Sequence, residues 1–179
     1  MGIGSLKVKQ IGICVWDLDK AEKSWTKVLG IEPLKIKTAD WNRCPSFSYD
    51  KADTFKPVDG LLYKLADEVL LEIYGPGEGS NPFGDYLKKY GEGVMNFAFY
   101  VPDLDNAYKA IGEVCEADGP YHVGLWPDHT YSYVDTIKEL KVQLNVKTNE
   151  DNTGLIKKLV ADPSSFAKDF NDRIKREEK

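Results

Sequence analysis

Four polar side chains hold equivalent positions in two internal repeats, and together they could act on a carbonyl compound. Gln10 and Asn96 occupy the same place in one repeat, and Glu72 and Asn145 occupy the same place in the other. The repeats are residues 10–21 with 96–107, and residues 69–73 with 142–146. If the strands that carry them curve around one cleft, we expect the four side chains to meet inside it.

Glu72 is the candidate general base of this set. A carboxyl group in a cleft with apolar walls ionises less readily than in water, so its pKa moves toward neutrality. The three carboxamides carry N–H donors that can stabilise an enolate-like oxygen. This combination permits a metal-free proton transfer next to a carbonyl, as in epimerisation, tautomerisation or elimination. The alternative is that the four residues bond to one another in a cleft that only binds a ligand.

Further candidates for acid–base chemistry are histidines and tyrosines. His122 and His129 are the two histidines of the chain, and either could reach the cleft mouth as an acid or base. A surface or loop position is the simpler alternative for both. Tyr74 and Tyr100 share the inward strand faces with the four polar residues, so they could bind or protonate a substrate oxygen, or simply line the pocket.

Aromatic residues gather in the segment 39–58, which we expect to be irregular and to cover a pocket. Trp41, Phe47 and Tyr49 could cover an aromatic or acyl ligand, with ordinary core filling as the alternative. Cys14 points into the same cleft by strand alternation, but no neighbour in sequence indicates a depressed pKa.

Composition excludes several classes of protein. The chain has 179 residues, 42% of them hydrophobic, and a net charge of -5 without a basic run. This favours a globular domain with a core and argues against a nucleic-acid partner. No apolar stretch approaches the roughly 18–20 residues of a membrane span, and no secretory signal is evident, so we expect a cytoplasmic protein. The three cysteines lie far apart, and we expect them to be reduced and mostly buried.

Each half of the chain reads as strand, helix and three strands. In the first half these elements are expected at Leu6–Val15, Leu18–Leu29, Leu34–Thr38, Leu61–Leu65 and Glu68–Tyr74. In the second half they are expected at Val94–Val101, Leu104–Val114, Cys115–Val123, Tyr131–Asp135 and Leu140–Lys147. Asp17 and Asp103 are the predicted N-caps of the two helices, and Gly30 ends the first.

The predicted fold class is α+β, with two tandem βαβββ modules that form an open curved sheet cleft, followed by a C-terminal helical tail. The boundaries are 1–80 for the first module, 81–92 for a linker with a helix at Pro82–Tyr90, 93–148 for the second module and 149–179 for the tail. An apolar stripe predicts that the tail packs on the body or on a second subunit. Its members are Leu155, Ile156, Leu159, Val160, Phe166, Phe170 and Ile174.

Over roughly residues 7–147 the sequence resembles the vicinal oxygen chelate superfamily, which includes glyoxalase I, methylmalonyl-CoA epimerase, extradiol dioxygenases and bleomycin-resistance proteins. The phrases that carry the resemblance are Val8–Ile13, Leu71–Pro76, Tyr86–Phe99 and Tyr133–Thr136, and they look most like the epimerase and glyoxalase branch. The resemblance implies two βαβββ modules around an open cleft. It also implies a divalent metal held by side chains at the positions of Gln10, Glu72, Asn96 and Asn145.

This chain departs from the family at those ligands. Metal-binding members place His at the positions of Gln10 and Asn96 and Glu at that of Asn145, so only the carboxylate of Glu72 is kept. One carboxylate with three amides is a poor site for zinc, nickel, cobalt or iron. We therefore expect no cofactor, with a weakly bound calcium- or magnesium-like ion as the alternative.

Three functions stay open from the sequence. The first is a metal-independent isomerase or lyase that moves a proton next to a carbonyl, with Glu72 as base. The second is a non-catalytic protein that binds a drug-like or aromatic ligand, and the third is a metal-dependent epimerase with unusual ligands. Extradiol dioxygenase chemistry is disfavoured because its iron needs two histidines and a carboxylate. The expected partners are a small molecule and a second copy of the chain in a homodimer.

Overall fold

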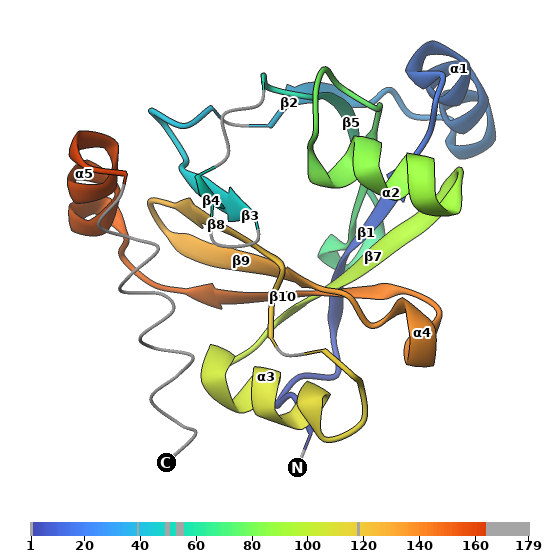
Figure 1. Ribbon diagram of the computed structural model, residues 1–179. Coiled ribbons are helices and arrows are strands. Elements are labelled where there is room, and N and C mark those ends of the chain that lie inside the picture. The colour runs from blue at the N-terminus through green and yellow to red at the C-terminus, as the bar shows by residue number, and fades with distance from the viewer. Residues whose placement is uncertain (1, 39, 49–50, 53–55, 118, 164–179) are drawn as a thin grey trace.

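Apolar and polar residues alternate in stretches such as residues 34–37 and 143–146, as a sheet with two different faces requires. The computed structural model describes residues 2–38, 40–48, 51–52, 56–117 and 119–163. Its strands are β1 (Val8–Cys14), β2 (Leu34–Lys37), β3 (Ser46–Ser48), β4 (Lys51–Ala52), β5 (Asp59–Lys64), β6 (Leu70–Tyr74), β7 (Gly93–Tyr100), β8 (His122–Trp126), β9 (His129–Val134) and β10 (Gln143–Asn149). They form one curved ten-stranded sheet in the order β2-β5-β6-β1-β7-β10-β9-β8-β3-β4 (Figure 1).

The sheet consists of two βαβββ modules joined edge to edge. The helices are α1 (Leu18–Leu29), α2 (Pro82–Tyr90), α3 (Leu104–Gly112), α4 (Ile137–Leu140) and α5 (Thr153–Ala161), with a 3₁₀ turn η1 at Ala66–Glu68. The first module runs β1-α1-β2-β5-β6 and the second β7-α3-β8-β9-β10. In each module the first strand pairs in parallel with the last, and β1 pairs antiparallel with β7 to join them. The predicted fold class is therefore confirmed.

Helices α1 and α3 cover the outer face of the sheet. Asp17 caps the N-terminus of α1 by accepting from the Lys20 N–H, and Gly30 ends it in a left-handed conformation with φ of 69°. The apolar stripe of α1 packs on β1, β5 and β6, and α3 packs on the corresponding strands of the second module. Figure 1 shows α1 at the upper right and α3 at the bottom. Within the described residues, every helix is too short or too polar to span a membrane.

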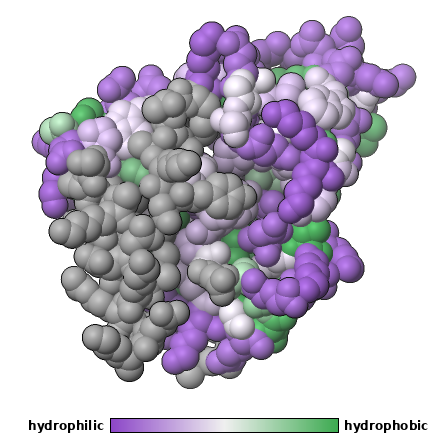
Figure 2. All heavy atoms as spheres, viewed as in Figure 1, coloured by the Kyte–Doolittle hydropathy of each residue, from purple (hydrophilic) through white to green (hydrophobic). Residues whose placement is uncertain are grey.

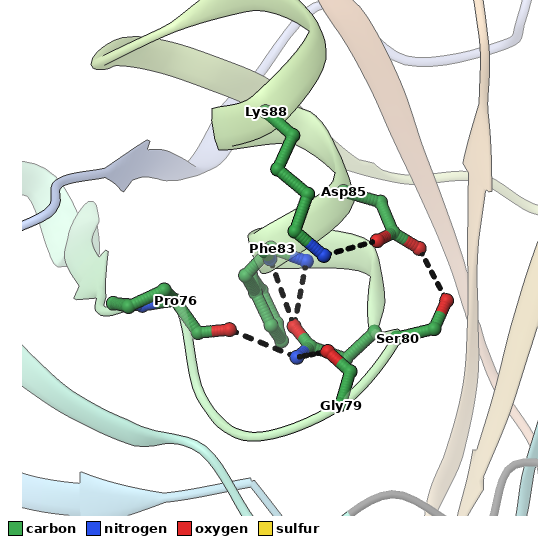
Figure 3. A network of polar contacts seen from close by, with 8 residues as sticks. Pro76, Gly79, Ser80, Phe83, Asp85 and Lys88 are labelled. Atoms are coloured by element: carbon green, nitrogen blue, oxygen red, sulfur yellow. Dashed lines mark hydrogen bonds and ion pairs between the residues drawn. The ribbon is translucent and has the colours of Figure 1, made fainter.

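Helix α2 lies against the inner face, and its N-terminus is anchored by Asn81. The Asn81 side-chain oxygen accepts from the backbone N–H groups of Phe83 and Gly84 at 3.1 and 2.9 Å. Its amide nitrogen donates to the carbonyl oxygen of Pro76 at 2.9 Å (Figure 3). This cap orients α2 so that Phe83 stacks on the Tyr74 ring, with the ring centroids 4.2 Å apart.

The segment between β2 and β5 reaches the far edge of the sheet. Its ends are pinned together, because Thr38 N–H donates to the Val58 carbonyl at 2.9 Å and Val58 N–H donates to Thr38 Oγ1 at 2.8 Å. Between them, β3 pairs with β8, and β4 pairs with β3 (Figure 1). The prediction that residues 39–58 are irregular is thus wrong for these two strands. β3 pairs with β8, which lies about seventy-five residues later in the chain, and β4 depends on β3, so no local pattern predicts either strand.

Other boundaries differ for local reasons. The predicted strand Cys115–Val123 begins only at His122, because Pro120 has no N–H for the ladder and Gly119 has φ of +106°. The predicted strand Leu140–Lys147 begins at Gln143, because α4 and a left-handed Lys141 precede it. Helix α3 ends at Gly112, two residues before the predicted end. The predicted bounds of α1 and α2 are confirmed.

Helix α5 shows that the first part of the tail packs on the body. Ile156 and Leu159 form a hydrophobic cluster with Phe47 of β3 and Leu125 of β8. The expected members Phe166, Phe170 and Ile174 of the apolar stripe lie outside the described residues.

Candidate functional site

The four polar residues lie on four adjacent strands at the centre of the sheet. Glu72 is on β6, Gln10 on β1, Asn96 on β7 and Asn145 on β10. Gln10, Glu72 and Asn145 each alternate with residues that pack under α1 or α3, which places their side chains on the inner face. Asn96 lies over Gly12, the strand partner of Glu72, and so shares that face. The three carboxamides are 1–3% exposed, and Glu72 is partly buried. We call this set the four-residue site.

Two small residues form the floor of the four-residue site. Strand register puts Gly12 between Glu72 and Asn96, and Ala98 between Gln10 and Asn145. The Asn96 side chain lies over Gly12, since a Cβ added there would come within 2.4 Å of Asn96 Nδ2. The small side chains let groups from non-adjacent strands approach one another.

Glu72 is held by two neighbouring donors. Gln10 Nε2 and the Tyr74 hydroxyl both donate to Glu72 Oε2, the latter at 3.0 Å. Burial raises the pKa of Glu72 above its ordinary value, and the charge of Lys147 and these two hydrogen bonds oppose that rise. Burial likewise raises the pKa of Tyr74 well above its ordinary value, aided by the charge of Glu72. Tyr74 therefore keeps its proton and is a hydrogen-bond donor to the carboxylate.

Lys147 belongs to this site and was missed by the sequence analysis. Its Nζ donates to Gln10 Oε1 at 2.6 Å, so Gln10 bridges Lys147 and Glu72. Burial lowers the pKa of Lys147, and the negative charge of Glu72 opposes that effect. Lys147 lies two residues after Asn145 in a strand, so alternation alone could have placed it on the inner face.

Two carboxamide oxygens of the site have no hydrogen-bond donor. These are Asn96 Oδ1 and Asn145 Oδ1, which are buried and unpartnered among the described residues. A buried acceptor without a donor costs free energy, and native proteins keep few of them. This unused capacity marks the place where a ligand or a water can donate a hydrogen bond.

The two histidines occupy different environments, and both lie in strands, His122 in β8 and His129 in β9. His122 is 2% exposed; its Nδ1 bonds Ser48 Oγ at 2.9 Å and its Nε2 bonds the Tyr131 hydroxyl at 3.1 Å. It lies in the same transverse row as Asn145, with Tyr133 between them.

His129 lies at the other end of β9, away from that row. It pairs with Asp128 and stacks on Trp126. Burial lowers the pKa of His129, and Asp128 opposes the change. Neither histidine has a described hydrogen bond to the four-residue site.

The remaining predicted pocket residues separate into two groups. Tyr74 contacts Glu72 directly, and Tyr100 lies on the inner face with its ring 6.2 Å from that of His129. Cys14 is fully buried under α2 beside Met95, and burial raises the pKa of its thiol to about 12. It is a packing residue of that helix contact.

Trp41 and Phe47 fill the core beneath α5. Their rings make an edge contact with centroids 5.2 Å apart. Phe47 alternates with Ser48, which bonds His122 on the inner face, so Phe47 points to the opposite side. The core-filling alternative therefore describes these two residues, and Tyr49 lies outside the described residues.

Two hollows border this region. The smaller, about 110 Å³, lies on the inner face and is lined in part by Ser48, Tyr121 and Gln143, where the Tyr121 hydroxyl donates to Gln143 Oε1 at 2.7 Å. The larger, about 800 Å³, is lined by Trp16, by paired lysines and carboxylates and by residues 75–78, and contains none of the four-residue site. On the face that Figure 2 shows, the coloured residues are mainly hydrophilic, with hydrophobic residues visible at the lower right. The lining of the smaller hollow likewise includes none of the four residues, but its member Gln143 is the strand partner of Asn96, so this hollow is the nearer to the site.

The donor set of the four-residue site does not fit a transition metal. It offers one carboxylate and three neutral amide oxygens, which zinc, nickel, cobalt and iron bind weakly. The ammonium group of Lys147, bonded to Gln10, would also repel a cation. In the part of the chain that the structure describes, no three His, Cys, Asp or Glu side chains gather closely enough to hold a metal.

Comparisons with known proteins agree with this architecture. A family model described as the Glyoxalase/Bleomycin resistance protein/Dioxygenase superfamily matches residues 9–114. No curated protein sequence matches the chain. A hypothetical protein from Bacillus halodurans C-125 superposes with a TM-score of 0.55 at 15% identity, covering 81% of this chain and 95% of that one.

Two methylmalonyl-CoA epimerases are also similar in structure. A variant of the Streptomyces coelicolor enzyme in complex with 2-nitronate-propionyl-CoA gives a TM-score of 0.51 at 18% identity, covering 81% of this chain and 95% of that one. The Mycobacterium tuberculosis enzyme gives a TM-score of 0.50 at 14% identity, covering 83% of this chain and 91% of that one. At these identities the likeness shows the fold alone.

Proposed function

Because this chain belongs to the glyoxalase, bleomycin-resistance and dioxygenase superfamily, we propose that it is a metal-independent isomerase or lyase that moves a proton next to a carbonyl. The observation that carries the proposal is the environment of Glu72. Burial raises the pKa of this carboxyl group, and hydrogen bonds from Gln10 and Tyr74 hold it at the centre of the sheet. A carboxyl group whose pKa lies nearer neutrality is still ionised in part at neutral pH, and its carboxylate is a stronger base than one with an ordinary pKa.

The roles of the remaining groups follow from their hydrogen bonds. Gln10 commits its N–H to Glu72 and its oxygen to Lys147, so it positions the base. Tyr74 donates to the same carboxylate oxygen and fixes its orientation. Asn96 and Asn145 bring carboxamides whose N–H groups can face an oxyanion. In this proposal Glu72 takes the proton, and the two asparagines stabilise the charge that appears on the carbonyl oxygen.

Similarity to methylmalonyl-CoA epimerases supports proton transfer beside a carbonyl as the reaction class. Those proteins share the fold at low sequence identity, so they support the reaction class by analogy and do not identify the substrate. We propose a small carbonyl compound or an acyl thioester as substrate.

The test is exchange of α-protons for deuterium, followed by proton NMR in deuterated water with a panel of ketones, keto acids and acyl thioesters. Glu72→Gln should slow exchange by about a hundredfold or more, because it removes the base without changing its shape. Glu68→Gln is the matched control: Glu68 is exposed, pairs with Lys9 and should have no effect. Equal rates for wild type and Glu72→Gln would overturn the proposal.

The aromatic lining of the inner face supports a second candidate, a protein that binds an aromatic or drug-like ligand without catalysis. Tyr131 and Tyr133 lie on β9 facing this side, and Phe83 of α2 packs between Tyr74 and Tyr133. Such rings supply large contact areas for a planar ligand. For a binder, Glu72→Gln would alter affinity at most, and no compound of the panel would exchange its protons.

A further inference from the structure

Lys147 has hydrogen-bonding capacity that its described contacts do not use. An ammonium group has three N–H donors, and Gln10 Oε1 is the hydrogen-bond acceptor that the described residues give it. The Tyr131 ring centroid lies 5.9 Å from Lys147 Nζ, a distance at which the cation–π contact is weak. Two donors therefore remain for a ligand.

The place of Lys147 in the sheet directs its ammonium group toward the four-residue site. Register puts Lys147 opposite Tyr100 and Tyr131, one row beyond Asn145. The Lys147 side chain nevertheless reaches Gln10 on β1. It can do so because the register puts only the small side chain of Ala98 between Gln10 and Asn145. The positive charge thus lies over the floor of the site, beside the carboxamides.

Asn96 Oδ1 and Asn145 Oδ1 supply the opposite capacity. Both oxygens are buried and accept no hydrogen bond from the described residues. They belong to strands β7 and β10, and Lys147 is on β10 as well. Unused donors and unused acceptors on neighbouring positions suit a ligand that offers both kinds of group.

We propose that Lys147 supplies the positive charge that a metal would supply in this fold, and that it binds a negatively charged oxygen of the ligand while Asn96 and Asn145 accept from an adjacent hydroxyl. The ligand class is a hydroxy acid, or a hydroxycarbonyl compound whose oxygen gains charge during reaction. The inference rests on the proposed function for the location of the ligand and deepens it by adding a residue and a substrate class. The alternative is that Lys147 only neutralises Glu72.

Three small probes separate the charge from the hydroxyl. Glycolate has a carboxylate and a hydroxyl, acetate has the carboxylate alone, and glycolamide has the hydroxyl with a neutral carbonyl. Dissociation constants can be measured by titrating each probe into the isotope-labelled protein and following its amide resonances. Wild type should bind glycolate about tenfold more tightly than glycolamide, since a hydrogen bond to a charged group is stronger than a neutral one. It should also prefer glycolate to acetate.

Variants assign the two preferences to residues. Lys147→Met should bring the ratio of glycolate to glycolamide affinity close to one, and Lys147→Arg should keep it above one. Asn145→Leu, which has nearly the same shape, should remove the preference for glycolate over acetate and leave the preference for the anion. Lys64→Met is the control, because Lys64 is exposed on β5.

Several results would overturn the inference. They are equal affinity of wild type for glycolate and glycolamide, binding of none of the probes, and an unchanged preference in Lys147→Met. The comparison of glycolate with glycolamide binding to the wild type still tests the inference if Lys147→Met fails to fold. Binding is also independent of turnover: if Glu72→Gln keeps full exchange while the anion preference depends on Lys147, the proposed function fails and this inference stands.

Discussion

A methyl group at position 12 would collide with Asn96 across the floor of the site. A Cβ built on Gly12 lies 2.4 Å from Asn96 Nδ2, 2.9 Å from its Cγ and 3.0 Å from its Oδ1. Asn96 is 2% exposed, so its side chain cannot swing into solvent to make room. Overpacking a buried position costs about 1–3 kcal/mol, which is a fall in Tm of about 2–12 °C at this chain length. We predict that Gly12→Ala lowers the free energy of unfolding by this amount.

The assay is urea denaturation of wild type, Gly12→Ala, Asn96→Ala and the double variant. Asn96→Ala removes the atoms that collide. In that background Gly12→Ala should be neutral or stabilising by up to about 1 kcal/mol, because Ala loses less backbone entropy than Gly on folding. The two changes should therefore show a coupling energy of about 1–4 kcal/mol. An equal cost of Gly12→Ala in both backgrounds would refute the placement of Asn96 over Gly12.

Three further predictions concern the base, the cap of α2 and the thiols. Because burial raises the pKa of Glu72, the folded protein holds its proton to higher pH than the unfolded chain, and stability falls as pH rises from the unfolded pKa through the folded one. Urea titrations across this window should show Glu72→Gln gaining stability relative to wild type as pH rises, and a constant difference would contradict the assignment. Asn81→Ala should lower the free energy of unfolding by about 1–2 kcal/mol, since it removes the N-cap of α2 and its bonds to the preceding loop; a loss too small to measure in urea would show that the cap does not hold the helix. Burial raises the pKa of Cys14 to about 12 and of Cys44 to about 11, so a thiol-specific disulfide reagent at mildly alkaline pH should react with them only after urea unfolds the chain; rapid reaction of the native protein would contradict their burial.

Local signals explain why α1 and α2 could be predicted to the residue. Asp17 and Gly30 bound α1 through side-chain and left-handed caps, and Pro82 with Gly91 bound α2. Each signal lies within a few residues of the helix end that it defines. The same reasoning missed α4, which has four residues and no side-chain cap at Thr136.

Internal repetition explains why the placement of the four residues on one face of adjacent strands could be predicted. The repeats gave the equivalent positions, and strand alternation gave the face of the sheet. Lys147 satisfied the same alternation, but its contact with Gln10 depends on how β10, β7 and β1 are aligned. A long side chain that crosses from one strand to a non-adjacent one is a tertiary contact that no local pattern contains.

Non-local pairing explains the error in the segment 39–58. Ser48 pairs with His122 and faces inward, so Phe47 faces outward and packs under α5. Its orientation follows from the register between β3 and β8, which are far apart in sequence. The aromatic composition of the segment could not distinguish a pocket cover from a core position.

The most direct test of the metal-independent chemistry is the metal content of the purified protein. It is measured by inductively coupled plasma mass spectrometry after incubation with zinc, nickel, manganese, magnesium or iron(II) and removal of the excess. One carboxylate beside a lysine ammonium should retain less than about a tenth of an equivalent of each metal. Near-stoichiometric retention of one metal in wild type, lost in Glu72→Gln, would contradict the account and make Glu72 a ligand.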